Sequence, residues 1–161
     1  MLLKKLNEYK MLTAICGSAI LYGLLAFSVN RIHELARQTM LKMNAIHHLE
    51  GSESKLKRYE LLISDDGFFR YRKYLLNGHQ EYYSFNMLRF NDLDYIGSTT
   101  IGTLVLRTQN DDVIVQTYHD SKGNVDSMTY QVDFPVKDIE AEDLLAIREN
   151  LFQIKRELQP K

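Results

Sequence analysis

The chain contains little cysteine, proline or tryptophan: one cysteine, two prolines and no tryptophan in 161 residues. A single cysteine excludes an intramolecular disulfide, and with it a fold held together by disulfides. The sequence also has no glycine-rich phosphate loop and no nucleophile-elbow motif, the local signatures of nucleotide-binding proteins and α/β-hydrolases. From these absences we expect a non-enzymatic protein with no catalytic residues and no cofactor.

Charge is unevenly distributed, although the net formal charge is only -1. Residues 1–50 carry six Lys or Arg against three Asp or Glu, and residues 51–161 carry fourteen against eighteen. The mildly acidic second part lacks the basic surface with which proteins bind nucleic acid. Basic residues beside an apolar segment are typical of the flanks of a membrane span. We therefore expect a membrane protein with no nucleic-acid partner.

One apolar stretch, Met11–Val29, contains no charged residue and no proline. As an α-helix it would extend roughly 28 Å, close to the ~30 Å hydrocarbon core of a bilayer. The run is longer than the apolar part of a signal peptide, which favours an uncleaved anchor. Positive charge resists translocation, so the short basic tail at residues 1–10 is expected in the cytoplasm. The sequence thus predicts a single-pass protein of a bacterial-type inner (cytoplasmic) membrane, with its C-terminal domain outside the cytoplasm.

Small side chains recur on one face of this predicted transmembrane helix, at Cys16, Ala19, Gly23 and Ala26. Pairs of small residues four positions apart let a second helix approach closely. The pattern predicts a helix–helix contact, either with another envelope protein or with a second copy of the chain. The alternative is a face that meets only lipid, because small residues are common in membrane helices.

Residues 30–50 keep a helical period without a break signal. Apolar side chains recur every three or four residues from Ile32 to Leu49. We expect an amphipathic juxtamembrane helix whose apolar stripe packs on the domain, on a partner helix, or on itself in a dimer. A short hinge over residues 51–57 is expected next, followed by a small domain over residues 58–161.

Beyond the hinge the apolar pattern changes to a period of two, which is typical of β-strands. Asp66-Gly67 and Asn77-Gly78 are turn signals, and the second predicts a type I′ hairpin because both of its residues accept positive φ. Two later runs are expected to pair as another hairpin, 101–108 with 113–118. The strands expected from the sequence are 59–64, 68–76, 79–88, 94–96, 101–108, 113–118 and 125–134.

Pro135 is expected to end the last strand, and a helix capped by Asp138 follows it. Its apolar stripe should lie across the sheet: Leu144, Ile147, Leu151, Ile154 and Leu158. The prediction is an α+β fold with an antiparallel sheet of about six or seven strands packed against one C-terminal helix. This order of elements resembles that of pleckstrin-homology-like domains, a curved sheet closed by a C-terminal helix. A simpler β-meander packed on a helix fits equally well.

Basic and aromatic residues alternate in the strand 68–76 and continue in its neighbour. Arg70, Arg72 and Tyr74 share one face of that strand, and the next strand adds Tyr82 and Tyr83. Arginine and exposed aromatic residues are enriched at protein interfaces, so these five residues are the candidate contacts with a partner protein. The alternative is a solvated outer face without a partner.

Two patterns have a partial likeness to metal sites. His47 and Glu50 have H-x-x-E spacing on one helical face, but no third ligand accompanies them. The segment Asp120–Asp126 has oxygen-bearing side chains at alternate positions, but it lacks the bidentate glutamate of a calcium loop and contains Lys122. We interpret both as structural and predict no metal ligands.

We therefore expect a non-enzymatic, single-pass membrane-anchored protein whose C-terminal domain binds another protein. Such a protein would be a subunit, accessory or scaffold of a cell-envelope assembly of the secretion, conjugation, motility or division type, or a membrane-anchored immunity or inhibitor protein. The alternative is a membrane-anchored module that senses a ligand or lipid, with Arg70 and Arg72 binding anionic headgroups.

Overall fold

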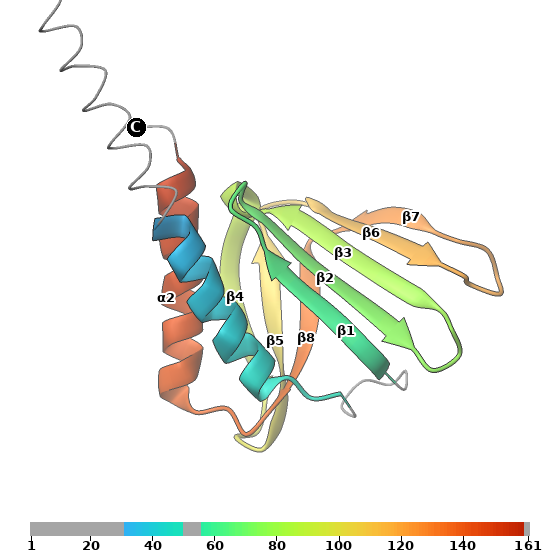
Figure 1. Ribbon diagram of the computed structural model, residues 1–161, viewed down its shortest axis with the longest axis horizontal. Helices are drawn as coiled ribbons and strands as arrows, with labels where there is room; N and C mark the ends of the chain where they lie inside the picture. The colour runs from blue at the N-terminus through green and yellow to red at the C-terminus, as the bar shows by residue number, and fades with distance from the viewer. Residues whose placement is uncertain (1–30, 50–55, 160–161) are drawn as a thin grey trace, which may run out of the picture.

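The computed structural model describes residues 31–49 and 56–159. These residues form an α+β fold with eight antiparallel strands in two sheets, packed against helices (Figure 1). An N-terminal helix covers residues 31–46. The other elements are β1 (Leu56–Ile63), β2 (Phe68–Leu75), β3 (Gln80–Asn86), the 3₁₀-helix η1 (Met87–Arg89), β4 (Phe90–Gly97), β5 (Ile101–Thr108), β6 (Val113–Tyr118), β7 (Asp126–Thr129), β8 (Gln131–Lys137) and α2 (Ala141–Leu158). The expected antiparallel α+β fold with a C-terminal helix is confirmed, with eight strands in place of six or seven.

The strands follow one another as a meander in which the last three long strands are bent. β3 continues through η1 into β4, β5 continues into β6, and β7 continues into β8. One half of each bent strand lies in a five-stranded sheet (β1-β2-β3-β6-β7), and the other half lies in a three-stranded sheet (β4-β5-β8). The hairpin expected between 101–108 and 113–118 is wrong, because these runs are two halves of one bent strand and pair with different neighbours.

Backbone hydrogen bonds between neighbouring strands continue through the bends. The N–H of Gln109 donates to the carbonyl oxygen of Arg89 at 3.0 Å, and the N–H of Thr108 donates to the carbonyl oxygen of Tyr130 at 2.8 Å. The Thr108 hydroxyl donates to the carbonyl oxygen of Asn110 at 2.7 Å and also lies 3.1 Å from the same Tyr130 oxygen. The two sheets are therefore one hydrogen-bonded surface that turns a corner.

The last predicted strand, 125–134, is divided at Tyr130 into β7 and β8. Its expected buried face is divided in the same way: Val132 and Phe134 are buried, whereas Met128 and Tyr130 are 61% and 50% exposed. Pro135 does not end the strand, since β8 runs on to Lys137. Proline is tolerated there because β8 is the edge strand of its sheet.

The turn between β2 and β3 confirms the predicted hairpin, although the turn type differs. Gly78 has a φ of 87°, whereas Asn77 is not among the described residues with positive φ. The N–H of Leu75 donates to the carbonyl oxygen of His79 at 2.9 Å, which closes a loop over residues 76–78. This is the pattern of a loop that ends in a left-handed glycine, so the type I′ prediction is wrong.

The hydrophobic core joins both sheets to α2. The predicted stripe of α2 is confirmed, with Ile147, Leu151 and Ile154 fully buried. The helix begins differently from the prediction, because its N-cap is Glu140 and not Asp138. Large side chains from the two sheets complete this core: Phe69, Tyr71, Phe85, Phe90, Leu104, Leu106 and Phe134.

The N-terminal helix packs into the same core. Its side chains Ile32, Ala36 and Met43 are buried, and they belong to one cluster with the sheet and α2 residues. The helix runs antiparallel to α2, as shown by ion pairs from Arg31 to Glu157 at 3.2 Å and from Lys42 to Asp143 at 2.6 Å. The sequence leaves three possibilities for the apolar stripe of this helix: the domain, a partner helix, or a second copy of the chain. In the described structure the stripe packs on the domain.

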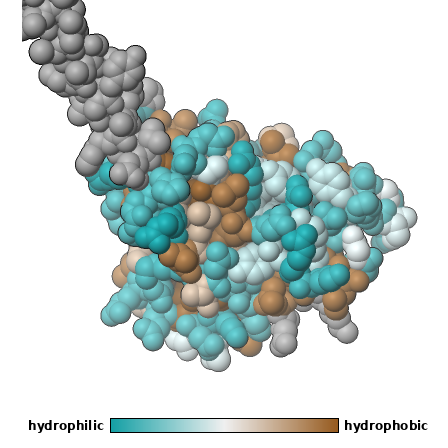
Figure 2. Space-filling view, in the orientation of Figure 1, coloured by the Kyte–Doolittle hydropathy of each residue, from teal (hydrophilic) through white to brown (hydrophobic). Residues whose placement is uncertain are grey.

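The end of the N-terminal helix is attached to the three-stranded sheet. His47 forms a β-bridge with Val136, and the N–H of His48 donates to the carbonyl oxygen of Pro135 at 3.0 Å. Figure 2 shows mostly hydrophilic residues over the two helices, with hydrophobic residues gathered between the helices and the sheet. The helix is thus a structural element of the domain.

Candidate functional site

Strand register brings four of the five predicted contact residues together on the outer face of the five-stranded sheet. Arg72 lies opposite Tyr82, and both Arg70 and Tyr74 are two positions from Arg72 on the same strand. Side chains alternate between the faces of a strand, so these four share one face. Tyr83 follows Tyr82 directly and therefore points to the opposite, inner face.

Arg72 occupies the centre of this outer face. Its guanidinium carbon lies 5.0 Å from the ring centroid of Tyr82 and 6.0 Å from that of Tyr118 on β6. Hydrogen bonding with Tyr74 raises the pKa of Arg72 above its usual value, so the group stays charged. Within the described residues, no carboxylate lies within ion-pair distance of it. The positive charge therefore lies beside two aromatic rings, and Glu60, opposite Arg72 on β1, interacts with that charge without forming an ion pair.

The neighbouring predicted residues are already engaged within the sheet. The guanidinium of Arg58 lies 3.4 Å from the ring centroid of Tyr74, and the Tyr74 hydroxyl donates to Glu60 at 3.0 Å. Arg70 donates to the Ser64 hydroxyl at 3.2 Å and lies 3.8 Å from a carboxylate oxygen of Asp66 in the preceding turn. These contacts hold the side chains that surround Arg72.

A shallow depression of about 210 Å³ lies among these side chains, lined by Glu60, Leu62, Arg70, Arg72 and Tyr82. Leu62 is 45% exposed and supplies an apolar wall. Cationic, aromatic and apolar groups that surround one depression can receive a side chain that carries both apolar and acidic atoms.

Tyr83 lies on the inner face, next to the core, and is not part of this surface. Its hydroxyl donates to Glu81 at 3.0 Å, and Lys73 lies 3.3 Å from the same carboxylate. Burial raises the pKa of Tyr83 above its usual value. The side chain is thus a structural link between the core and a partly buried ion pair.

A buried histidine on the inner face is a second notable group, which the sequence places on the amphipathic juxtamembrane helix. His47 is only 7% exposed, and its Nε2 lies 2.8 Å from the hydroxyl oxygen of Tyr71. Its ring stacks on Tyr59 with centroids 3.7 Å apart and meets Phe134 edge-on at 4.5 Å. Helical spacing in the sequence does not indicate this burial, because His47 lies just past the end of the helix, where it forms a β-bridge with Val136.

The environment of His47 disfavours its charged form. Burial, with a smaller effect of nearby Lys73, lowers the pKa of His47 to about 4. Its Nδ1 atom is buried and has no hydrogen-bond partner among the described residues. A proton on that atom would have no acceptor, so the ring is neutral at physiological pH.

The two partial metal patterns do not develop further in the described structure. Within residues 31–49 and 56–159, no three His, Cys, Asp or Glu side chains come together as metal ligands would. Glu50, the expected partner of His47, lies outside the described residues. The acidic loop at 120–124 is the turn between β6 and β7, where Asp120 accepts a hydrogen bond from the N–H of Lys122.

The predicted transmembrane contact residues lie outside the described residues: Cys16, Ala19, Gly23 and Ala26. Among the helices that are described, none has the length and apolar character needed to span a bilayer.

In comparisons with known proteins, no family model, no curated protein and no solved structure matches this chain. The choice of the outer face around Arg72 as the candidate site therefore rests on the geometry of that face alone.

Proposed function

We propose that the chain is a non-enzymatic, membrane-anchored protein whose C-terminal domain binds another protein through the outer face of the five-stranded sheet. The anchor in this proposal is the apolar stretch Met11–Val29. The domain then serves as a subunit or scaffold of a cell-envelope assembly of the secretion, conjugation, motility or division type, or as a membrane-anchored immunity or inhibitor protein.

One observation carries this proposal: Arg72 lies beside Tyr82 and Tyr118 and forms no ion pair with a carboxylate among the described residues. Glu60, opposite Arg72 on β1, is bonded to Arg58 and Tyr74 instead. Arginine and tyrosine are the residue types most often found at the energetic centre of protein interfaces. A charged group that is held by aromatic rings loses little side-chain entropy when it binds. An acidic side chain of a partner that is seated in the adjoining depression would complete the site.

Site-specific photocrosslinking in the native membrane tests this proposal. A photoreactive amino acid at Tyr82 should give a discrete crosslinked product in the full-length protein. Arg72→Ala should weaken that product strongly, because a central contact is worth about 2 kcal/mol or more, or roughly 30-fold in affinity. Arg37→Ala is the matched control, since Arg37 is an exposed arginine on the N-terminal helix already bonded to Glu34. Equal products from both variants, or a monomer that gives no product, would refute the proposal.

A second candidate is recognition of anionic lipid, with a pleckstrin-homology-like sheet as the fold. The supporting observation is that Arg58, Arg70 and Arg72 all lie on the same outer face of β1 and β2. Glu60 is bonded to Arg58 and Tyr74 and neutralises part of this charge. This leaves Arg72 for a single carboxylate but weakens the clustered positive charge that an anionic headgroup would use. Binding of a short-chain anionic lipid to the full-length protein in neutral detergent micelles distinguishes the two. Saturable binding that is lost in Arg70→Ala with Arg72→Ala would favour the lipid.

A further inference from the structure

Sheet edges in this fold are covered at three places by specific contacts. At β4, Lys155 of α2 donates to the carbonyl oxygen of Phe90 at 2.5 Å. At β1, the N–H of Ile63 donates to the sulfur of Met40 on the N-terminal helix at 3.2 Å. At β8, the His48 N–H donates to Pro135. Open strand edges pair readily with other chains, and these contacts occupy backbone groups at three of the edges.

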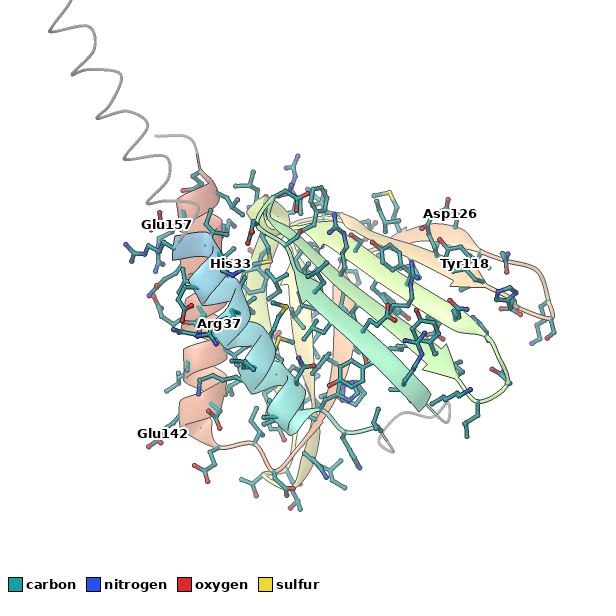
Figure 3. The ribbon with its side chains drawn as sticks, in the orientation of Figure 1. His33, Arg37, Tyr118, Asp126, Glu142 and Glu157 are labelled. Atoms are coloured by element: carbon teal, nitrogen blue, oxygen red, sulfur yellow. The ribbon has the colours of Figure 1, made fainter. Side chains whose placement is uncertain are left out.

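The edge of β7 has no such cover among the described residues. Asp126, Ser127 and Met128 are all exposed, so this strand meets solvent on both of its faces. Figure 3 shows Tyr118 and Asp126 on the β6–β7 pair, at the end of the sheet away from the helices. Neither proline nor lysine, the residues that commonly protect an edge, occurs in the strand.

Backbone geometry identifies the groups that this edge offers. The N–H of Thr117 on β6 donates to the carbonyl oxygen of Val125 at 2.9 Å. Because a residue in an antiparallel strand directs both of its backbone groups to one side, and successive residues alternate, Ser127 and Thr129 face β6. Asp126 and Met128 therefore direct their N–H and C=O groups away from the sheet. An added strand can pair with both residues.

Exposed apolar side chains surround the same edge. Val125, Met128 and Tyr130 are 50%, 61% and 50% exposed along the strand. Ile114 lies opposite Met128 on β6 and is also exposed. An added strand would cover these side chains as well as form hydrogen bonds, which is the recognition mode known as β-augmentation.

The charge of the edge indicates the kind of strand that fits. The charged residue of β7 itself is Asp126, which is exposed, whereas Asp133 lies further along the chain on β8 in the other sheet. Within the described residues neither carboxylate forms an ion pair; Asp133 accepts only from Gln131 at 2.9 Å. Arg107 on β5, whose guanidinium carbon lies 5.8 Å from the ring centroid of Tyr130, is already bonded to Asp94 at 2.6 Å. A second copy of the chain would add like charge, whereas a basic strand would complement it.

We propose that β7 accepts an extended segment of a partner protein, a strand with alternating apolar side chains and with lysine or arginine near its ends. This site goes beyond the surface around Arg72, because it uses main-chain groups at an edge and prefers the opposite charge. The two sites make independent contacts, and each is tested by its own variants.

The test measures peptide binding to the full-length protein in detergent micelles by fluorescence anisotropy. The probe is a synthetic peptide of alternating valine and threonine with lysine at both ends, and a matched peptide has glutamate at both ends. The lysine peptide should bind about tenfold more tightly, since each exposed charge pair contributes up to ~1 kcal/mol. A lysine peptide with N-methylated backbone amides should not bind, because it cannot donate to the edge. Equal binding of the lysine and glutamate peptides, or undiminished binding of the methylated one, overturns the proposal.

Two variants separate main-chain from side-chain recognition. Met128→Pro removes an outward N–H and should abolish binding, whereas Met128→Ala keeps that N–H and should weaken binding less than about threefold. If both variants lose binding equally, the site is an apolar patch and not a strand edge. If the protein instead shows a concentration-dependent mass that Met128→Pro abolishes, the occupant is a second copy and the proposal is wrong. Arg72→Ala should leave peptide binding unchanged.

Discussion

Acidification should destabilise the domain through His47. The ring is buried against Tyr59 and Phe134, and its pKa is lowered to about 4 from an ordinary value of 6.5. As the pH falls below 6.5, His47 binds a proton in the unfolded chain but not in the folded chain, so the free energy of unfolding decreases. The decrease ends near pH 4, where both states carry the proton. Each pH unit in this window costs about 1.4 kcal/mol, so the full loss is about 3 kcal/mol.

Urea unfolding of the full-length protein in detergent, followed by circular dichroism at pH 7.5 and at pH 4.5, measures this effect. Carboxyl groups also titrate in this range, so the comparison is with His47→Gln, which keeps a polar partner for Tyr71 and cannot titrate. Between these two pH values, the wild type should lose about 2–3 kcal/mol more than His47→Gln does.

His33→Gln is the matched control, because His33 is exposed and lies 3.1 Å from Asp65. This variant should lose as much stability as the wild type between the two pH values, because it leaves the ring of His47 and its contacts unchanged. If His47→Gln and the wild type lose stability in parallel as the pH falls, then His47 is protonated in the folded state. The conclusion that burial keeps this ring neutral is then wrong.

Two further predictions concern stability and are measured by the urea midpoint. Met43→Ala should destabilise by about 2–5 kcal/mol, because Met43 is fully buried between the N-terminal helix and the core, whereas Leu41→Ala on the exposed side should change stability by less than about 0.5 kcal/mol. Gly67→Ala should destabilise more than Gly78→Ala. Both glycines have positive φ, but a Cβ at Gly67 would lie 2.6 Å from Leu158, whereas nothing lies within 4 Å at Gly78. Equal effects in either pair would show that the described packing is wrong.

Periodicity in the sequence predicts strand positions well and strand partners poorly. The runs 101–108 and 113–118 are strands with the predicted bounds, yet they do not pair with each other. Residues 109–112 have the composition of a hairpin turn, Gln-Asn-Asp-Asp, but here they form the corner of a bent strand. The corner depends on Thr108, which bonds to Tyr130 more than twenty residues away. A contact at that separation leaves no local signal.

The candidate site likewise has a part that periodicity predicts and a part that it does not. The basic and aromatic residues around Arg72 are visible in the sequence because they recur with a period of two. The same period excludes Tyr82 and Tyr83 from a common face, so only one of the two could be an outer contact. The burial of His47 could not be predicted from periodicity, because the hydroxyl group that pairs with its ring belongs to Tyr71 on a distant strand.

The N-terminal helix determines where this protein can be shortened. A soluble fragment would naturally begin after the apolar stretch and its adjoining helix, near the boundary at residue 58 that the sequence suggests. Such a fragment would lack Ile32, Ala36 and Met43, and the core surfaces that they cover would face water. It would also expose the edge of β8 that His47 and His48 now occupy. Fragments intended for binding experiments should therefore retain the chain from residue 31 onward, because one that starts later is expected to aggregate.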